Sequence, residues 1–374
     1  MTKPLAGTLV LSLDQAVAAP MTSRKLADAG ARVIKLERPE GDFARYYDDV
    51  VLGQCTHFVW LNRGKESVVA DLTKAEDRAL FEAIVAKADV LVQNLKPGAL
   101  AKLGFATEAL CRRYPKLICC SISGYGDVGP YRNRKAYDLL IQAESGLASV
   151  TGGPEAPARV GVSVVDICTG MNAYEAILEA LISRGRTGKG ADIRVSMFDS
   201  MMEWMAIPML YTEYGAPPKR IGLSHPTVAP YGVFATRDAV PILISIQNDR
   251  EWVSFATKVL RQPDLVSDPR FASNPGRTAN RAETDGLVER CFGAQDFAAL
   301  ARQLETAQIA FARVNDVTDI LAHPHLRRLK VASPEGPIHL PMPPAQIMGE
   351  EPSFGPLPSL GEHTAAVRRE FVGA

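Results

Sequence analysis

The chain has 374 residues, enough to bury a large core, and this length predicts two domains, or one large domain with an appendage. Lysine plus arginine and aspartate plus glutamate number 42 each, so no global field attracts nucleic acid or an anionic membrane. Disordered, fibrous and strongly basic classes are therefore disfavoured, and any anionic ligand must be held by local cations.

Cysteines and apolar runs set the expected compartment. The six cysteines have neither the density of a disulfide scaffold nor Cys-x-x-Cys spacing, which disfavours both disulfides and a zinc site. The apolar run after Lys3 is too short for a signal peptide, and no run reaches membrane-spanning length. We expect a cytoplasmic protein with reduced thiols, no bound metal, and neither a membrane nor a nucleic acid as partner.

Short runs rich in β-branched residues alternate with helical patterns in the first part of the chain. The runs span residues 8–13, 32–36, 67–71, 90–95, 117–122 and 192–196. This alternation predicts a largely parallel sheet with helices on both faces. The expected fold class is α/β, with a large doubly wound, Rossmann-like domain and a small α+β domain.

Helix ends are marked by capping and turn residues. Pro20 and Gly30 bracket a helix between the first two strands, and Thr73 with Glu76 forms a capping-box pattern before another. The clearest helix directly follows Asp166, with apolar residues at helical spacing up to Leu181, and the glycine-rich turn at 186–190 ends it.

Four segments are expected along the chain. The large domain takes 1–215, a linker 216–230, the small domain 231–325, and a return strap with the last part of the large domain 326–374. Two strands, 232–236 and 241–247, begin the small domain, and helices follow to about residue 306. Eight prolines between Pro334 and Pro358 predict that the strap runs extended over the surface.

The opening strand–helix–strand pattern, with Glu37 at the end of its second strand, is typical of dinucleotide-binding domains. The glycine fingerprint of those domains is missing, because residues 14–20 read DQAVAAP. The chain also has no Gly-x-Ser-x-Gly and no His-Glu-x-x-His motif. NAD(P) enzymes, serine hydrolases and zinc proteases are therefore all disfavoured.

Asp166 has two interpretations, which are compatible. As the residue before a helix it is a candidate N-cap. The partial positive charge of a helix N-terminus also lowers the pKa of a carboxylate, which keeps it ionised and able to attack an acyl carbonyl. Spacing alone leaves both roles open, with Asp166 as a candidate nucleophile.

The residues around it, Val165-Asp166-Ile167-Cys168-Thr169-Gly170-Met171, resemble the catalytic aspartate motif of the class III CoA-transferases. Further matches follow in order along nearly the whole chain. They are PLAG at 4–7, AAP at 18–20, GARVIKLER at 30–38, GD at 41–42, NLKPG at 94–98, SGYG at 123–126, KAYD at 135–138, RTGKG at 186–190 and LGEHT at 360–364.

The resemblance implies a CoA site and an assembly. The implied CoA-binding residues are Val17, Ala18, Arg38, Ala70, Asp71, Leu72, Thr73, Asn94, Leu95, Lys96, Lys102, Lys135, Ala136, Tyr137 and Asp138. Cations among them suit the phosphates of CoA, and apolar members suit adenine and pantetheine. The implied assembly is a homodimer of interlocked, ring-like chains.

The resemblance also implies the chemistry. Asp166 attacks the donor thioester to give a mixed anhydride, CoA then attacks the aspartyl carbonyl to give an enzyme thioester, and an acceptor carboxylate reverses the steps. CoA and acyl-CoA are substrates, and no tightly bound cofactor is expected. Acyl-CoA racemases of the 2-methylacyl-CoA type, in the same family, carry a histidine where this chain has Tyr137. A transferase is therefore preferred to a racemase, with a non-catalytic acyl-CoA-binding protein as a further alternative.

The resemblance also narrows the range of expected substrates. Residues 224–232 lack the glycine-rich flap of oxalate-using members and are closer to members that act on C4 and C5 dicarboxylates. We expect succinyl-CoA as donor and an itaconate-, mesaconate- or citramalate-like acid as acceptor, and we disfavour formyl-CoA and oxalate. The second carboxylate of such an acid needs a cation, for which Arg45, Arg159 and His225 are candidates.

Overall fold

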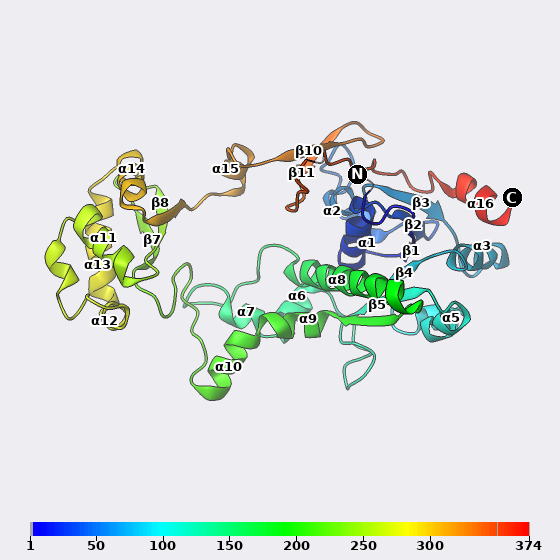
Figure 1. Ribbon diagram of the computed structural model, residues 1–374, viewed down its shortest axis with the longest axis horizontal. Helices are drawn as coiled ribbons and strands as arrows, with labels where there is room; N and C mark the ends of the chain where they lie inside the picture. The colour runs from blue at the N-terminus through cyan, green and yellow to red at the C-terminus, as the bar shows by residue number, and fades with distance from the viewer. Residues whose placement is uncertain (1–2, 350, 374) are drawn as a thin grey trace. The chain divides into compact units, whose positions relative to one another are not determined.

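The protein is described from a computed structural model covering residues 3–349 and 351–373. The chain divides into two compact units (Figure 1). The first comprises residues up to 148, 159–207 and from 327 onward; the second comprises 149–158 and 208–326. The helices α7 (Leu147–Val150) and α10 (Ala206–Tyr214) lie where the chain passes from one unit to the other.

The first unit is built on a six-stranded sheet in which all neighbouring strands are parallel. Its strands are β1 (Leu9–Leu13), β2 (Arg32–Glu37), β3 (Lys65–Val69), β4 (Val90–Gln93), β5 (Ile118–Ser123) and β6 (Asp192–Ser196). The spatial order is β3-β2-β1-β4-β5-β6, the doubly wound order that reverses direction at β1. All six predicted strands are present, and their ends shift by at most a few residues.

Alternating strand residues feed two cores, one on each face of the sheet. Leu11, Ile34 and Leu91 pack on the face covered by α3 (Ala75–Val85), α5 (Thr107–Arg113) and α16 (Thr364–Val372). Val10 and Val33 pack on the opposite face, covered by α1 (Ala18–Asp28) and α8 (Val164–Thr187). The expectation of helices on both faces is confirmed.

The first unit contains five further helices in its described residues. They are η1 (Phe43–Tyr46), α2 (Thr56–Leu61), α4 (Ala99–Lys102), α6 (Asp138–Glu144) and α9 (Met197–Trp204). Gly188, with φ of 72°, ends α8 in the left-handed conformation, as the predicted turn requires. The predicted capping box before α3 is wrong: Lys74 is the N-cap residue and makes no side-chain cap, while Thr73 donates to Asp71.

The C-terminal strap contains more regular structure than its prolines predict. β10 (Arg328–Val331) and β11 (Ile338–Pro341) form an antiparallel pair. Leu329 and Leu340 pack from this pair against Phe58 of α2. The prolines lie at or beyond the strand ends, where the ladder loses no N–H donor. They therefore do not prevent the two strands from pairing.

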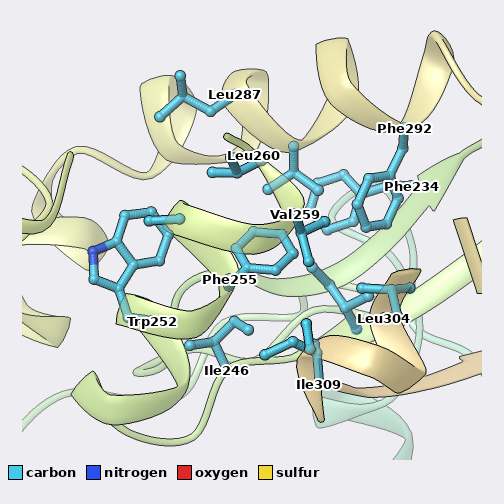
Figure 2. Close-up of a cluster of buried hydrophobic side chains, with 14 of the residues drawn as sticks. Phe234, Ile246, Trp252, Phe255, Val259, Leu260, Leu287, Phe292, Leu304 and Ile309 are labelled. Carbon is cyan, nitrogen blue, oxygen red and sulfur yellow. The ribbon is translucent and has the colours of Figure 1, made fainter. Parts of the chain in front are cut away.

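The second unit has its own sheet and core. The strands β7 (Tyr231–Ala235), β8 (Pro241–Ser245) and β9 (Ala310–Arg313) are antiparallel in that order. The helices are α11 (Asp249–Ser254), η2 (Phe255–Val259), η3 (Pro263–Val266), α12 (Asn274–Ala279), α13 (Arg281–Gly293), α14 (Phe297–Ala307) and α15 (Val317–Leu321). Trp252, Phe255 and Phe292 fill the centre of the core (Figure 2). Within the described part of the chain, no helix combines the length and apolar character needed to cross a bilayer.

Candidate active site

Asp166 lies in the first turn of α8, at its third residue. Ser163 precedes the helix and makes no side-chain cap hydrogen bond. The prediction that Asp166 stands before the helix as its N-cap is therefore wrong. The side chain is instead half-buried in the first turn, where backbone N–H groups have no partner within the helix.

Asp138, the first residue of α6, supplies the cap. Its Oδ1 accepts hydrogen bonds from the N–H of Val165 at 2.8 Å and of Asp166 at 3.3 Å. Its Oδ2 accepts one from the side-chain amide of Gln142 at 2.7 Å. The carboxylate that the family resemblance assigned to CoA is thus engaged by two helices of the protein itself.

The environment of Asp166 raises the pKa of its carboxyl group to about 7, mainly through burial and then through the negative charge of Asp138. The expected lowering by the helix N-terminus is therefore wrong. Loss of hydration and a neighbour of like charge outweigh the partial positive charge of the helix end. At neutral pH the group is divided between acid and carboxylate, and only the carboxylate is a nucleophile.

Tyr47, just after η1, lies close to the same carboxylate, although nothing in the sequence singles it out. Burial, followed by the charges of Asp42, Asp166 and Tyr137, raises the pKa of its phenol to about 12. Its ring meets that of His57 edge-on, with centroids 5.5 Å apart. An aromatic residue in a short loop has no periodicity that links it to a helix far along the chain, so only the fold reveals this neighbour.

Close packing of α1 against α8 brings the loop between β1 and α1 beside the first turns of α8, where Asp166 lies. A Cβ atom on Gly170 would lie 2.5 Å from the carbonyl oxygen of Ala18, so this contact requires glycine. Thr22 Oγ1 donates to the Gly170 carbonyl at 3.0 Å, and Ile167 packs against Val17. Val17 and Ala18, two of the expected CoA residues, therefore lie against the first turns of α8.

A cavity of about 160 Å³ lies at the carboxyl ends of β1 to β4. Ligands of open parallel sheets bind at this edge, near the strand where the order reverses. The expected CoA residues that line the cavity are Arg38, Ala70, Asp71, Leu72, Thr73 and Leu95. The structure thus brings together residues from three separate loops of the predicted set.

The expected CoA residues also include four exposed cations, which are available to phosphate groups: Arg38 at the cavity, Lys96, Lys102 and Lys135. Tyr137 is exposed as well. The amide of Asn94 is used within the protein, because it exchanges hydrogen bonds of 2.9 and 2.8 Å with the backbone of Gln15. Ala136 packs closely against Gly124.

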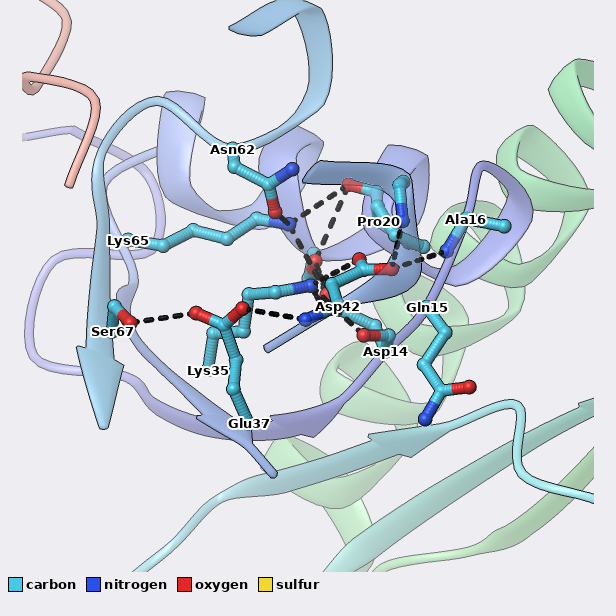
Figure 3. Close-up of polar contacts among 12 residues, drawn as sticks. Asp14, Gln15, Ala16, Pro20, Lys35, Glu37, Asp42, Asn62, Lys65 and Ser67 are labelled. Atoms are coloured by element: carbon cyan, nitrogen blue, oxygen red, sulfur yellow. Dashed lines mark hydrogen bonds and ion pairs between the residues drawn. The ribbon is translucent and has the colours of Figure 1, made fainter. Parts of the chain in front are cut away.

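A buried network of charges fixes the loops that border the cavity (Figure 3). Lys35 is bonded to Asp14 and, at 2.9 Å, to Asp42, while Lys65 reaches Asp14 at 3.1 Å. All four side chains are fully buried. Asp42 also accepts the N–H of Ala16 at 3.2 Å, where the backbone has a φ of 61°. One carboxylate therefore ties the loop before α1 to the loop after β2.

The three candidates for binding the second carboxylate differ sharply. Arg45 gives two hydrogen bonds, of 2.9 and 2.8 Å, to Glu37 and lies 3.6 Å over the ring of Phe58. Its charge is therefore already paired. Arg159 is exposed in the unit that holds Asp166, and His225 stacks on Tyr231 in the second unit.

Asp48, Cys55 and His57 have potential metal-ligand atoms within 4.8 Å of one another. Asp48 accepts hydrogen bonds from the N–H and hydroxyl of Thr56 at 2.9 and 2.7 Å and from Cys55 at 3.4 Å. These bonds at the start of α2 account for the close approach of Asp48 and Cys55. We assign no metal role to the group.

The chain thus combines a doubly wound α/β sheet with a half-buried aspartate, of raised pKa, at the start of the long helix α8. Residues 5–364 match CoA-transferase family III, and the chain belongs to this family of enzymes. The family expected from the sequence is confirmed.

Similar proteins cover almost the whole chain. It is 37% identical over 375 residues to the acetyl-CoA:oxalate CoA-transferase of Acetobacter aceti, covering 99% of this chain and 96% of that protein. It is 34% identical over 385 residues to the succinate–glutarate CoA-transferase of Agrobacterium fabrum, covering 98% and 96%. The crystal structure of a CAIB/BAIF family protein from Brucella suis matches with a TM-score of 0.85 and 36% identity, covering 99% of this chain and 100% of that one.

Proposed function

We propose that this enzyme moves CoA from an acyl-CoA donor to a small C4–C5 dicarboxylate, with Asp166 as the nucleophile. The observation that carries the proposal is the setting of Asp166 in a family III CoA-transferase. It lies at the start of α8, beside the Val17–Ala18 segment, with its pKa raised to about 7. Family membership makes CoA thioesters the substrate class.

Asp166 reacts in its ionised form. Its carboxylate attacks the thioester carbonyl carbon, the C–S bond breaks, and CoA leaves as a thiolate, which gives an aspartyl mixed anhydride. The thiolate then attacks the aspartyl carbonyl and releases the donor acid as a carboxylate. The acceptor carboxylate attacks the resulting aspartyl-CoA thioester, and the same steps run in reverse. The energy of the acyl bond is retained throughout.

CoA is assigned to the strand-end cavity and the surfaces that continue from it. Exposed Arg38, Lys96, Lys102 and Lys135 supply charge for its phosphates. The Val17–Ala18 segment, whose side chains are buried, lies against the first turns of α8 next to Asp166. We include Tyr47 among the residues of this region, because the charge of Asp166 contributes to the raised pKa of its phenol.

For the substrates, succinyl-CoA is the preferred donor and an itaconate-, mesaconate- or citramalate-like acid the preferred acceptor. The succinate–glutarate relative supports a dicarboxylate of this size. The relative that acts on oxalate, at 37% identity, makes oxalate a second acceptor, against the expectation from residues 224–232. Arg159 and His225 stay as proposed anchors for the second carboxylate, whereas the paired charge of Arg45 makes it the weakest of the three.

We also propose that the enzyme acts as a cytoplasmic homodimer. The assembly proposal is supported by α10, which has no buried residue although it is largely apolar. The compartment is supported by the six cysteines, all of which are free thiols.

The test is a matrix of donors and acceptors. The purified enzyme is incubated with succinyl-CoA or acetyl-CoA and each candidate acid, and the CoA esters are read by mass spectrometry. We expect Asp166→Asn to fold normally and to lose transfer, because an amide forms no anhydride. Asp199→Asn, a matched change in the first turn of α9, should keep full activity. Normal turnover by Asp166→Asn would refute the mechanism.

A further inference from the structure

The carboxylate of Asp138 joins α6 to α8 at the point where Asp166 lies. It caps α8 through the N–H groups of Val165 and of Asp166 itself. Gln142, one turn further along α6, donates to Asp138 and accepts the N–H of Val160 at 2.9 Å. Three donors therefore fix the position of Asp138, and the segment leading into α8 is held by the same set of bonds.

The same carboxylate places a second negative charge beside the nucleophile. Two other titratable groups that interact with Asp166 are Tyr47, near η1, and Cys168, on α8. The pKa of Tyr47 is raised to about 12 and that of Cys168 to about 11, in both cases mainly by burial, so both groups are neutral at pH 7. The charge that repels ionised Asp166 at neutral pH therefore comes from Asp138.

We propose that Asp138 is a positioning residue that fixes the first turn of α8 and, through its charge, favours conversion of Asp166 from a free carboxylate into covalent aspartyl intermediates. This inference rests on the proposed function. In the first step the negative charge of Asp166 leaves with the CoA thiolate as the C–S bond breaks. In the second step the thiolate attacks the aspartyl carbonyl, and the negative charge passes to the released donor carboxylate.

The carboxyl group of Asp166 is uncharged in both the anhydride and the thioester. The repulsion from Asp138 is therefore present in the free enzyme and is relieved in each covalent state. Relief of this repulsion shifts the equilibrium towards the intermediates, since the repulsion raises the free energy of the reactant state and not that of the covalent states. A residue whose role was only to cap the helix would lack this second effect.

Two variants separate position from charge. Asp138→Asn keeps an oxygen that can accept both N–H groups of α8 and removes the charge together with the acceptor for Gln142, whereas Asp138→Ala removes the oxygens and the charge. Asp199→Asn in the exposed first turn of α9 is the control for loss of a helix-start carboxylate. The readouts are the pH profile of kcat/KM, the KM for acyl-CoA, and the ratio of covalent to free enzyme by intact mass after an acid quench.

For Asp138→Asn we expect the acid limb of the pH profile to move down by about one unit and the covalent-to-free ratio to fall about tenfold. Its kcat at pH 8 should stay within a few-fold of wild type. Asp138→Ala should show the same shift together with a further loss of kcat of at least about tenfold, because the first turn of α8 is no longer fixed. The difference in activity between Asp138→Asn and Asp138→Ala measures how much the positioning of α8 contributes to catalysis.

An unchanged acid limb and covalent ratio in Asp138→Asn, with normal transfer by wild type, would overturn this inference and leave the proposed function intact. Should Asp138→Ala fail to fold, as judged by circular dichroism, the Asn variant alone decides the question of charge. A wild-type enzyme that gives neither transfer nor a covalent adduct would overturn the proposed function itself, and this inference with it.

Discussion

At the scale of single residues, the setting of Asp166 has a consequence for stability as well as for reactivity. Its pKa rises from 3.8 to about 7 on folding, with burial as the main cause and Asp138 as the second. Between these pH values the folded protein keeps a proton that the unfolded chain has released. The free energy of unfolding therefore falls as pH rises from about 4 to about 7, and this loss is complete above pH 7.

We therefore expect Asp166→Asn, although inactive, to be more stable than wild type at pH 8. The amide removes the cost of ionisation at this half-buried site. Each pH unit between the two pKa values corresponds to at most about 1.4 kcal/mol, and partial solvent access to Asp166 reduces the total to about 2 kcal/mol. Urea unfolding at pH 8 and pH 4 measures the difference, which should vanish at pH 4. A gain that is the same at both pH values, or a loss at pH 8, would contradict the assigned pKa.

At the scale of elements, the contact between α1 and α8 sets the distance between the proposed CoA-binding loop and Asp166. Gly170→Ala would place a Cβ atom 2.5 Å from the Ala18 carbonyl oxygen and 2.8 Å from Met21 Cβ. We expect this change to cost about 2 kcal/mol of unfolding free energy and to raise the KM for acyl-CoA, because the helices must move apart.

Gly185→Ala is the matched control, because it lies in the same helix and its Cβ would meet nothing within 4 Å. It should be neutral or stabilise by up to about 1 kcal/mol, as alanine does when it replaces glycine in a helix. Urea unfolding and steady-state kinetics of both variants provide the comparison. Equal stability of the two would show that α1 and α8 are not tightly packed at Gly170.

Sequence patterns predicted the elements that form by local rules and missed the contacts that depend on the fold. The strands of the large sheet and the course of α8 follow from periodicity and turn residues, which are readable over a few residues. The capping of α8 by Asp138 is different, since donor and acceptor come from separate helices. For the same reason, no local pattern indicates that burial reverses the expected pKa shift of Asp166.

At the scale of the whole molecule, the order of the strands could not be predicted residue by residue. Nothing local in β1 shows that β2 and β4 lie on either side of it, although the choice places the loop ends around one cavity. The strand β9 was missed because it is short and has little alternation, and it forms by pairing with β8. Such edge strands are defined by their partner more than by their own sequence.

The assembly is predicted from α10, a largely apolar helix in which no residue is buried. α10 carries Ile207, Met209, Leu210, Tyr211 and Tyr214, which are 50% to 79% exposed. A contiguous apolar surface of this kind is uncommon on a monomer and typical of an interface. We propose a second copy of the chain as the occupant, in line with the homodimer that the family resemblance implies.

Light scattering should therefore give the mass of a dimer for the wild-type enzyme at micromolar concentration. Leu210→Asp places a charge on the apolar surface of α10 and should shift the equilibrium to monomer, because burying an unpaired carboxylate is costly. CoA transfer should fall with the dimer fraction if assembly completes the enzyme. Glu213→Ala, at an exposed polar position of the same helix, is the control and should remain dimeric. A fully active wild-type monomer would refute the assembly, whereas a dimer unaffected by Leu210→Asp would place the interface away from α10.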